Sequence, residues 1–296
     1  MNNAAKSAAN AAGTTNLGPV GVYLAALQRE PVDAQRAAVA WIEELGYGSV
    51  FEGEVVGRND IFAQEAVWLC ATSRIVAGAG IANIWARHPA TARAAAEALG
   101  EAWPGRFVFG LGVSHASAID QTGQRYERPL ERMREYLDGM GEVTVPRVLA
   151  ALRPRMLELA RDRTDGAHTY FVPPEHTAQA RAVLGPDRLL IPEQAVVVET
   201  DPATARDIAR RHTRRYLELP NYVNNLKHLG FSDEDVAGTG SDRLVDTIVA
   251  WGDAATVARR VRAHRDAGAD HVLVQPLGDD IKDAVRQLEE LKPALA

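Results

Sequence analysis

The sequence predicts an α/β fold of the (β/α)8 type, the TIM barrel. Eight apolar runs rich in β-branched residues alternate with eight helix-like stretches along the 296 residues. A barrel of this kind typically takes about 250 residues, so the length agrees. A doubly wound sheet needs fewer strands, and no GxGxxG pattern follows the first strand. These observations favour a closed barrel with insertions after the fourth strand and in the seventh crossover.

Each expected strand is a short apolar run bounded by glycine, polar or charged residues. The third is the most informative, because the run after Arg74 ends in Gly-Ala-Gly and gives way to Asn83, Trp85 and then Pro89. The carboxyl ends of the strands carry the catalytic residues in this fold, so the end of the third strand is a candidate site. The eight strands are expected within 18–27, 49–54, 74–80, 106–111, 147–152, 166–172, 189–199 and 270–275.

The stretches between these strands have helical character, and several begin at a proline or an aspartate, which are favoured at a helix start. The helices are expected at 31–45, 60–70, from 89 onward, and at 129–138, 154–162, 174–184, 201–216 and from 281 onward.

Two polar segments interrupt the repeat, Gly112 to Arg128 and Leu217 to Ser241. Long insertions on the upper face of a barrel usually serve as lids or oligomer contacts. The second insertion could equally form a helical hairpin that packs on its own barrel. Residues 1–16 are expected to be a disordered leader, which leaves 17–296 as a single barrel domain.

Composition excludes several classes of protein. The net charge of −6 provides no basic field for nucleic acid or for an anionic membrane. The apolar stretch from Ile75 to Ala86 is too short to cross a bilayer, and the first residues lack the apolar core of a signal peptide. The single cysteine, Cys70, is expected to be a core thiol. We therefore expect a cytoplasmic protein.

Two kinds of chemistry are disfavoured by the motifs. The eight histidines are scattered without HxH or HExxH spacing, so no metal site is expected. No GxSxG elbow is present for covalent hydrolysis. What remains is a set of polar residues at expected strand ends, namely Glu52, Glu54, Asn83, Ser114, His115, Arg153, His168, Glu193 and Gln194.

Each of these residues has a structural alternative, which is to cap a loop or to bond a neighbour. Glu193 and Gln194 favour that alternative, because a polar side chain inside a strand is often structural. His115 favours function, because a histidine just past a strand can exchange a proton near neutral pH.

Several segments stand out in order along the chain: GYGSVFEGE, TSRIVAGAGIANIWARHPA, RFVFGLGVSH, PLERMREYLD, the stretch from LAALRPRM to PPEHTAQAR, DRLVDTIVAWGD and HRDAGADHVLVQ. Together they resemble the luciferase-like oxidoreductase superfamily. Within the superfamily they are most similar to the branch that depends on the deazaflavin coenzyme F420 (luciferase-like monooxygenase relatives use FMN). The resemblance covers nearly all of Gly18 to Leu291.

The resemblance implies a third strand that ends in a bulge with a non-prolyl cis peptide behind the deazaflavin ring, and Gly80-Ile81 matches it. Asn83 matches a polar residue that lines the ring. The strand-two pair facing the reacting edge corresponds to Gly53 and Glu54. His115 occupies the place of a proton donor or ring contact.

The cofactor's side chain and phosphate are bound in relatives by two further segments, which correspond here to Leu152, Arg153 and Pro154, and to Gly166, Ala167 and His168. One position departs from the family pattern, because Arg153 replaces a glycine that would let the backbone approach a phosphate closely. The arginine either supplies a cation or obstructs the site.

The resemblance therefore implies hydride transfer between F420 and a small organic substrate, with His115 or Glu54 as the proton donor. An FMN-dependent monooxygenase and a non-catalytic ligand-binding homologue remain alternatives. A homodimer is expected.

Overall fold

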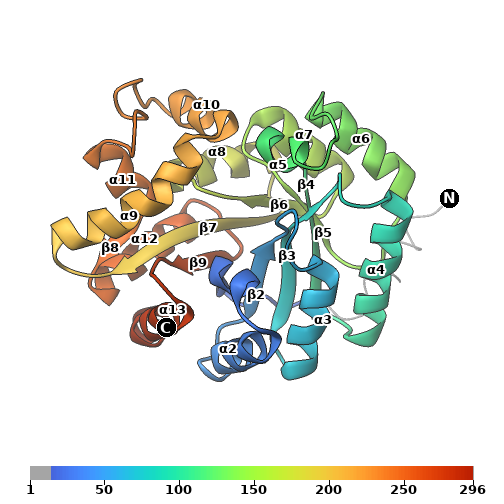
Figure 1. Ribbon diagram of the computed structural model, residues 1–296, viewed down its shortest axis with the longest axis horizontal. Coiled ribbons are helices and arrows are strands. Elements are labelled where there is room, and N and C mark those ends of the chain that lie inside the picture. The colour runs from blue at the N-terminus through green and yellow to red at the C-terminus, as the bar shows by residue number, and fades with distance from the viewer. Residues whose placement is uncertain (1–14, 296) are drawn as a thin grey trace.

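Eight parallel strands close into a barrel in the computed structural model, which describes residues 15–295 (Figure 1). The ring closes where β6 pairs with β7, β7 with β9 and β9 with β1. The ring strands are β1 (Val20–Tyr23), β2 (Ser49–Gly53), β3 (Val76–Asn83), β4 (Phe107–Gly112), β5 (Arg147–Ala150), β6 (Gly166–Thr169), β7 (Leu189–Val198) and β9 (Val272–Pro276). The predicted (β/α)8 barrel is confirmed.

A short additional strand, β8 (Ala250–Gly252), pairs with the last residues of β7 and extends the sheet beyond the ring. The helices are α2 (Val32–Glu44), α3 (Ile61–Ala71), α4 (Pro89–Ala102), α5 (Ala116–Asp120), α6 (Pro129–Met140), α7 (Pro154–Arg163), α8 (Pro174–Leu184), α9 (Pro202–Leu217), α10 (Pro220–His228), α11 (Asp242–Ile248), α12 (Ala254–Asp266) and α13 (Ile281–Leu291). Two 3-10 turns, η1 (Ala25–Arg29) and η2 (Lys292–Leu295), complete the order.

The barrel interior is filled by one small cluster of side chains that includes Phe51, Val108, Val148 and Leu273. Phe51 needs a glycine opposite it, because a Cβ on Gly78 would lie 2.2 Å from the phenyl ring. A larger apolar cluster spans the strands and the helices that cover them. The strands are therefore buried on both faces, as parallel strands usually are.

The second insertion forms α10 and the loop that leads to α11. Its apolar side chains Tyr222, Leu226 and Phe231 are buried in a cluster with residues of β7, α9 and α11. This arrangement agrees with the alternative in which the segment packs on its own barrel. In the first insertion, α5 follows β4 directly.

Several sequence expectations were wrong in detail. The first strand ends at Tyr23 because η1 begins two residues later, and the fifth and sixth strands end at Ala150 and Thr169. Cys70 is exposed on α3 rather than buried in the core. Residues 1–14 of the expected leader lie outside the described residues. Among residues 15–295, no helix is long and apolar enough to cross a membrane.

Candidate active site

The carboxyl ends of β2, β3 and β4 form one side of the barrel mouth, and β3 is irregular there. Glu52 pairs with Ala79 but Gly53 pairs with Ile81, so Gly80 is an extra residue on β3. The same excess appears against β4, where the register shifts between Gly78 and Ala82. The predicted bulge at Gly80-Ile81 is confirmed, and the isomer of its peptide bond stays a prediction.

Glycines line this side because a tyrosine lies against it. A Cβ on Gly53 would lie 2.8 Å from the hydroxyl oxygen of Tyr23, and one on Gly80 would lie 2.9 Å from a carbon of that ring. Tyr23 is stacked on the far side with His168, with ring centroids 6.0 Å apart, and is tilted against Tyr170 at 5.2 Å. The missing Cβ atoms of the two glycines therefore make room for the Tyr23 ring, which packs against this side of the mouth.

The β6 residues lie deeper than the sequence suggested. Gly166 and Ala167 are buried at the amino end of the strand, and a Cβ on Gly166 would lie 2.1 Å from the Leu189 carbonyl oxygen. The structure therefore does not bring them to the mouth. His168 is buried inside the barrel with Nδ1 2.8 Å from the Ile191 carbonyl oxygen. Burial lowers the pKa of His168 to about 4, so the ring is neutral.

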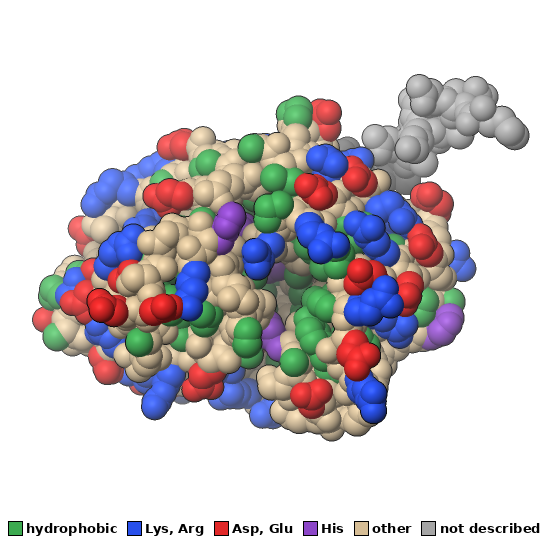
Figure 2. All heavy atoms as spheres, turned by 90° about the horizontal axis from the view of Figure 1, so that it is seen from above, with side chains coloured by type: hydrophobic (Ala, Val, Ile, Leu, Met, Phe, Trp, Pro, Cys, Tyr) green, Lys and Arg blue, Asp and Glu red, His purple; other side chains and the backbone are tan. Residues whose placement is uncertain are grey.

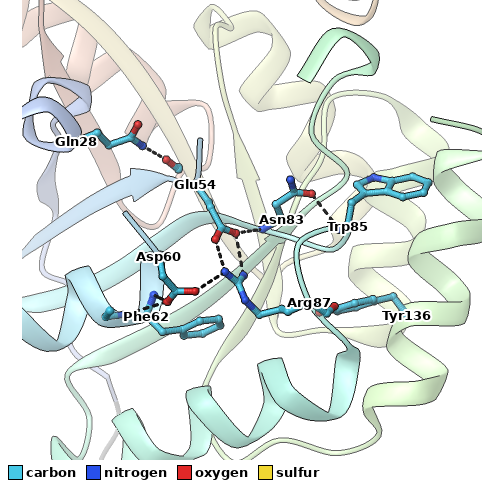
Figure 3. Close-up of polar contacts among 10 residues, drawn as sticks. Gln28, Glu54, Asp60, Phe62, Asn83, Trp85, Arg87 and Tyr136 are labelled. Carbon is cyan, nitrogen blue, oxygen red and sulfur yellow. Dashed lines mark hydrogen bonds and ion pairs between the residues drawn. The ribbon is translucent and has the colours of Figure 1, made fainter. Parts of the chain in front are cut away.

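Glu54 sits in an ion-pair network centred on Arg87 (Figure 3). Arg87 Nη1 donates to Glu54 Oε2 at 2.8 Å, and Nη2 bonds both Glu54 Oε1 and Asp60 Oδ2, the latter at 2.7 Å. The guanidinium also lies over the Phe62 ring, 5.0 Å from its centroid. Glu54 Oε2 accepts a further hydrogen bond of 2.7 Å from the backbone N–H of Asn83. Glu54 is therefore held as an acceptor of several hydrogen bonds.

A cavity of about 360 Å³ opens beside this network. Asn83, at the end of β3, lines it together with Glu54 and Trp85. The Asn83 side-chain oxygen accepts the backbone N–H of Trp85 at 3.1 Å, which fixes the amide in the turn. The volume falls within the range of small-molecule pockets, which is about 300–1,000 Å³.

His115 follows β4 and meets α10 from across the mouth. Ser114 has a left-handed φ of 56°, an unusual conformation for a residue with a side chain, and it turns the chain before His115. The His115 ring lies 5.6 Å from the ring of Tyr222. Burial lowers the pKa of His115, while a hydrogen bond with Asn221 acts in the opposite direction. Viewed from above, the surface is hollowed near the centre of this face, with histidine side chains in and beside the hollow (Figure 2).

A tyrosine cluster that the sequence reasoning missed lies on the other side of the mouth. The Tyr170 hydroxyl is 2.7 Å from the Tyr216 hydroxyl and 2.7 Å from Gln275 Oε1. Tyr170 remains partly exposed, so it is available to a ligand in the mouth. The sequence signal that could have identified Tyr170 is its position directly after the sixth strand.

Glu193 points into the barrel beneath this cluster. Its Oε2 accepts the backbone N–H of Phe171 at 3.1 Å, and Phe171 has a left-handed φ of 59°. Burial raises the pKa of Glu193 to about 8. Gln194, by contrast, points outward and bonds the Ile248 carbonyl oxygen at 2.9 Å. Glu52 also points outward, where its Oε2 accepts from Gln64 at 2.8 Å.

The segment after β5 places cations at a helix start. Arg153 is the N-cap residue of α7, Pro154 is its first residue, and both Arg153 and Arg155 are exposed. Arg153 has no ion-pair partner among residues 15–295, and the nearby Asp162 pairs with Arg161. The helix dipole and two arginines make this end suited to an anion. The Leu152 carbonyl oxygen is already engaged, 2.6 Å from His176 Nε2.

Within the same described range, no cluster of three potential metal ligands occurs. The polar side chains at these strand ends are the Asn83 amide, the Tyr170 hydroxyl and the His115 ring, with exposed arginines at the start of α7.

Comparison with known proteins agrees with this geometry. Residues 11–144 match the luciferase-like monooxygenase family model. A Mycobacterium tuberculosis protein named as a coenzyme F420-dependent oxidoreductase is 33% identical over 125 residues, which are 42% of this chain and 36% of that protein. The match thus spans about a third of that relative's length. A 5,10-methylenetetrahydromethanopterin reductase of Archaeoglobus fulgidus is 22% identical over 86% of this chain and 93% of its own.

Solved structures share the fold. An F420-dependent secondary alcohol dehydrogenase in complex with an F420-acetone adduct superposes with a TM-score of 0.75 and 15% identity, over 94% of this chain and 99% of its own. The oxygenating constituent of 3,6-diketocamphane monooxygenase from Pseudomonas putida, in complex with FMN, superposes with a TM-score of 0.70 and 15% identity, over 94% and 99% of the two chains. The family-model match over residues 11–144 supports the resemblance to the luciferase-like superfamily, and the solved structures show the shared fold.

Proposed function

We propose that this chain is an F420-dependent oxidoreductase that transfers a hydride between the deazaflavin and a small organic substrate. The observation that carries the proposal is the bulge at Gly80-Ile81, at the carboxyl end of β3 and within residues 11–144, which the family model matches. When bound, the deazaflavin supplies a two-electron hydride donor or acceptor.

The protein's own residues supply binding, orientation and proton transfer. Gly53, Gly80, Ile81 and Asn83 would contact the ring system, and Arg153 with the start of α7 would bind the anionic tail. His115 is the proposed proton-transfer residue, because Glu54 is already committed to Arg87. A lowered pKa keeps the His115 imidazole neutral at pH 7, so one nitrogen can accept a proton from a substrate hydroxyl when the substrate is oxidised.

The test is equilibrium titration of the purified protein with F420 and, in parallel, with FMN, followed by fluorescence. Tight binding of F420 with weak binding of FMN supports the proposal. Preference for FMN would instead indicate a monooxygenase on the same scaffold, and binding of neither would indicate a non-catalytic homologue. A cytoplasmic location and a homodimer stay predictions.

A further inference from the structure

Arg87 is attached to the barrel at two points, although it lies in the turn between β3 and α4. Its backbone carbonyl oxygen accepts the Tyr136 hydroxyl of α6 at 3.1 Å. Its side chain, 12% exposed, bridges Glu54 after β2 and Asp60 at the start of α3. An arginine whose backbone and side chain are both fixed can hold its carboxylate partner in one orientation.

Glu54 in turn spans the bulged end of β3. Its backbone N–H donates to the Ile81 carbonyl oxygen at 2.9 Å, and its side chain accepts the Asn83 N–H at 2.7 Å. A bulge disrupts the regular ladder and leaves backbone groups in need of other partners. Glu54 supplies such a partner to the residues on either side of Ala82.

The charge balance around Glu54 depends on this one arginine. The Glu54 side chain is 7% exposed. Glu54 and Arg87 both act on the pKa of Glu65 of α3 and on that of the Tyr136 hydroxyl, and Asp60 and Glu52 add negative charge near Glu65. Burial, and next the neighbouring carboxylates, raise the pKa of Glu65 well above its usual range, whereas Arg87 acts in the opposite direction. A buried carboxylate that loses its cation takes up a proton or destabilises the fold.

We propose that Arg87 is a positioning residue that sets the shape of the Gly80-Ile81 bulge and the place of Asn83 by fixing the Glu54 side chain through its ion pair. The effect on cofactor affinity rests on the proposed function, whereas the effect on the β3 backbone does not. Arg87 itself touches neither substrate nor cofactor in this assignment.

The test compares Arg87→Met with Asp60→Asn. Asn retains the cap at the start of α3, so Asp60→Asn removes one ion pair of Arg87 and leaves the Glu54 pair in place. We expect Arg87→Met to weaken F420 binding about tenfold or more, and Asp60→Asn by about twofold or less. Exchange of the Asn83 amide hydrogen should accelerate by a similar factor in Arg87→Met alone.

A double variant separates positioning from a general loss of structure. In Arg87→Met the Glu54 side chain is left buried without its cation, so the variant should unfold at a lower urea concentration than the native protein. Arg87→Met/Glu54→Gln should recover part of this stability and slow the exchange of the Asn83 amide hydrogen relative to Arg87→Met, because the neutral amide still accepts the Asn83 N–H and leaves no uncompensated charge.

Equal effects of Arg87→Met and Asp60→Asn on Asn83 exchange, or no recovery of exchange and stability in Arg87→Met/Glu54→Gln, would overturn the assignment. If the native protein fails to bind F420, the proposed function fails, while exchange and unfolding still decide the role of Arg87.

Discussion

At the residue scale, the two candidate proton-transfer residues, Glu54 and His115, differ in how many hydrogen bonds they already make. Glu54 accepts hydrogen bonds from Arg87 and from the backbone N–H of Asn83, so both carboxylate oxygens are engaged. His115 has a ring neighbour in Tyr222 and a polar neighbour in Asn221. Of the two residues that the sequence nominated for proton transfer, His115 is the one whose surroundings leave a nitrogen for the reaction.

Replacing His115 with alanine should therefore lower turnover by ~10²-fold, the scale expected for loss of an acid or base. Cofactor affinity should change by about threefold or less, because the ring contacts lie elsewhere. F420 reduction by a panel of small alcohols measures both. His88→Ala, at an exposed N-cap of α4, is the matched control.

The pH dependence of turnover gives a second test of His115. Burial lowers the pKa of His115 from its ordinary value of 6.5, so activity should fall only at a pH below 6.5. Native-like turnover in His115→Ala would contradict the assignment of His115 as the proton-transfer residue.

Arg153 should help rather than obstruct binding, since it is exposed at a helix start with its charge unpaired among the described residues. Arg153→Gly is expected to weaken F420 binding by about tenfold at low salt and by less at high salt, because screening shortens the reach of the charge. Titrations at the two salt concentrations measure the difference. Tighter binding by the variant would mean that the side chain blocks the phosphate position.

At the scale of elements, sequence patterns predicted the eight ring strands and most helices, because hydrophobic periodicity is a local property. β8 was missed, since its three residues leave almost no pattern. The bulge at Gly80 was placed through the family resemblance. The Arg87–Glu54 pair was missed because its members lie 33 residues apart and meet only when β2 and β3 are adjacent. Likewise, no local pattern shows that Gly166 faces Leu189 rather than the mouth.

The helix α10 covers one side of the mouth through Tyr222, whose ring meets those of His115, Phe171 and Tyr216. Tyr222→Ala should loosen α10 and speed cofactor release by about tenfold, whereas Tyr222→Phe keeps the ring contacts and should behave like the native protein. Stopped-flow dissociation measures the rate, and light scattering the oligomeric state. Identical release rates in both variants, with no change in the mass of the oligomer, would show that α10 only packs against the barrel.

At the scale of the whole molecule, buried neutral histidines should make the free energy of unfolding fall at acidic pH. Burial lowers the pKa of His168 and His271 to about 4, and that of His212 and His264 to about 3. Below the ordinary value of 6.5 the unfolded chain binds more protons than the folded one. Stability contributed by these groups is therefore full above about pH 6.5 and falls as the pH drops toward their folded values.

Each such histidine lowers the free energy of unfolding by up to about 1.4 kcal/mol per pH unit across that window. Urea unfolding at about pH 7 and about pH 5 should show a clear loss at the lower pH. Replacing His271 with glutamine should reduce the slope, whatever it does to absolute stability. A free energy that stays level between the two values would contradict the neutral assignment.

The central claim is that the mouth binds a deazaflavin ring against the bulged end of β3. A crystal structure of the protein with F420 tests it directly. The account predicts the ring in contact with Gly80 and Ile81, the Asn83 amide at its edge, and the anionic tail at Arg153 and the start of α7. A ring bound elsewhere on the molecule, or a mouth left without F420 at saturating concentration, would contradict the account.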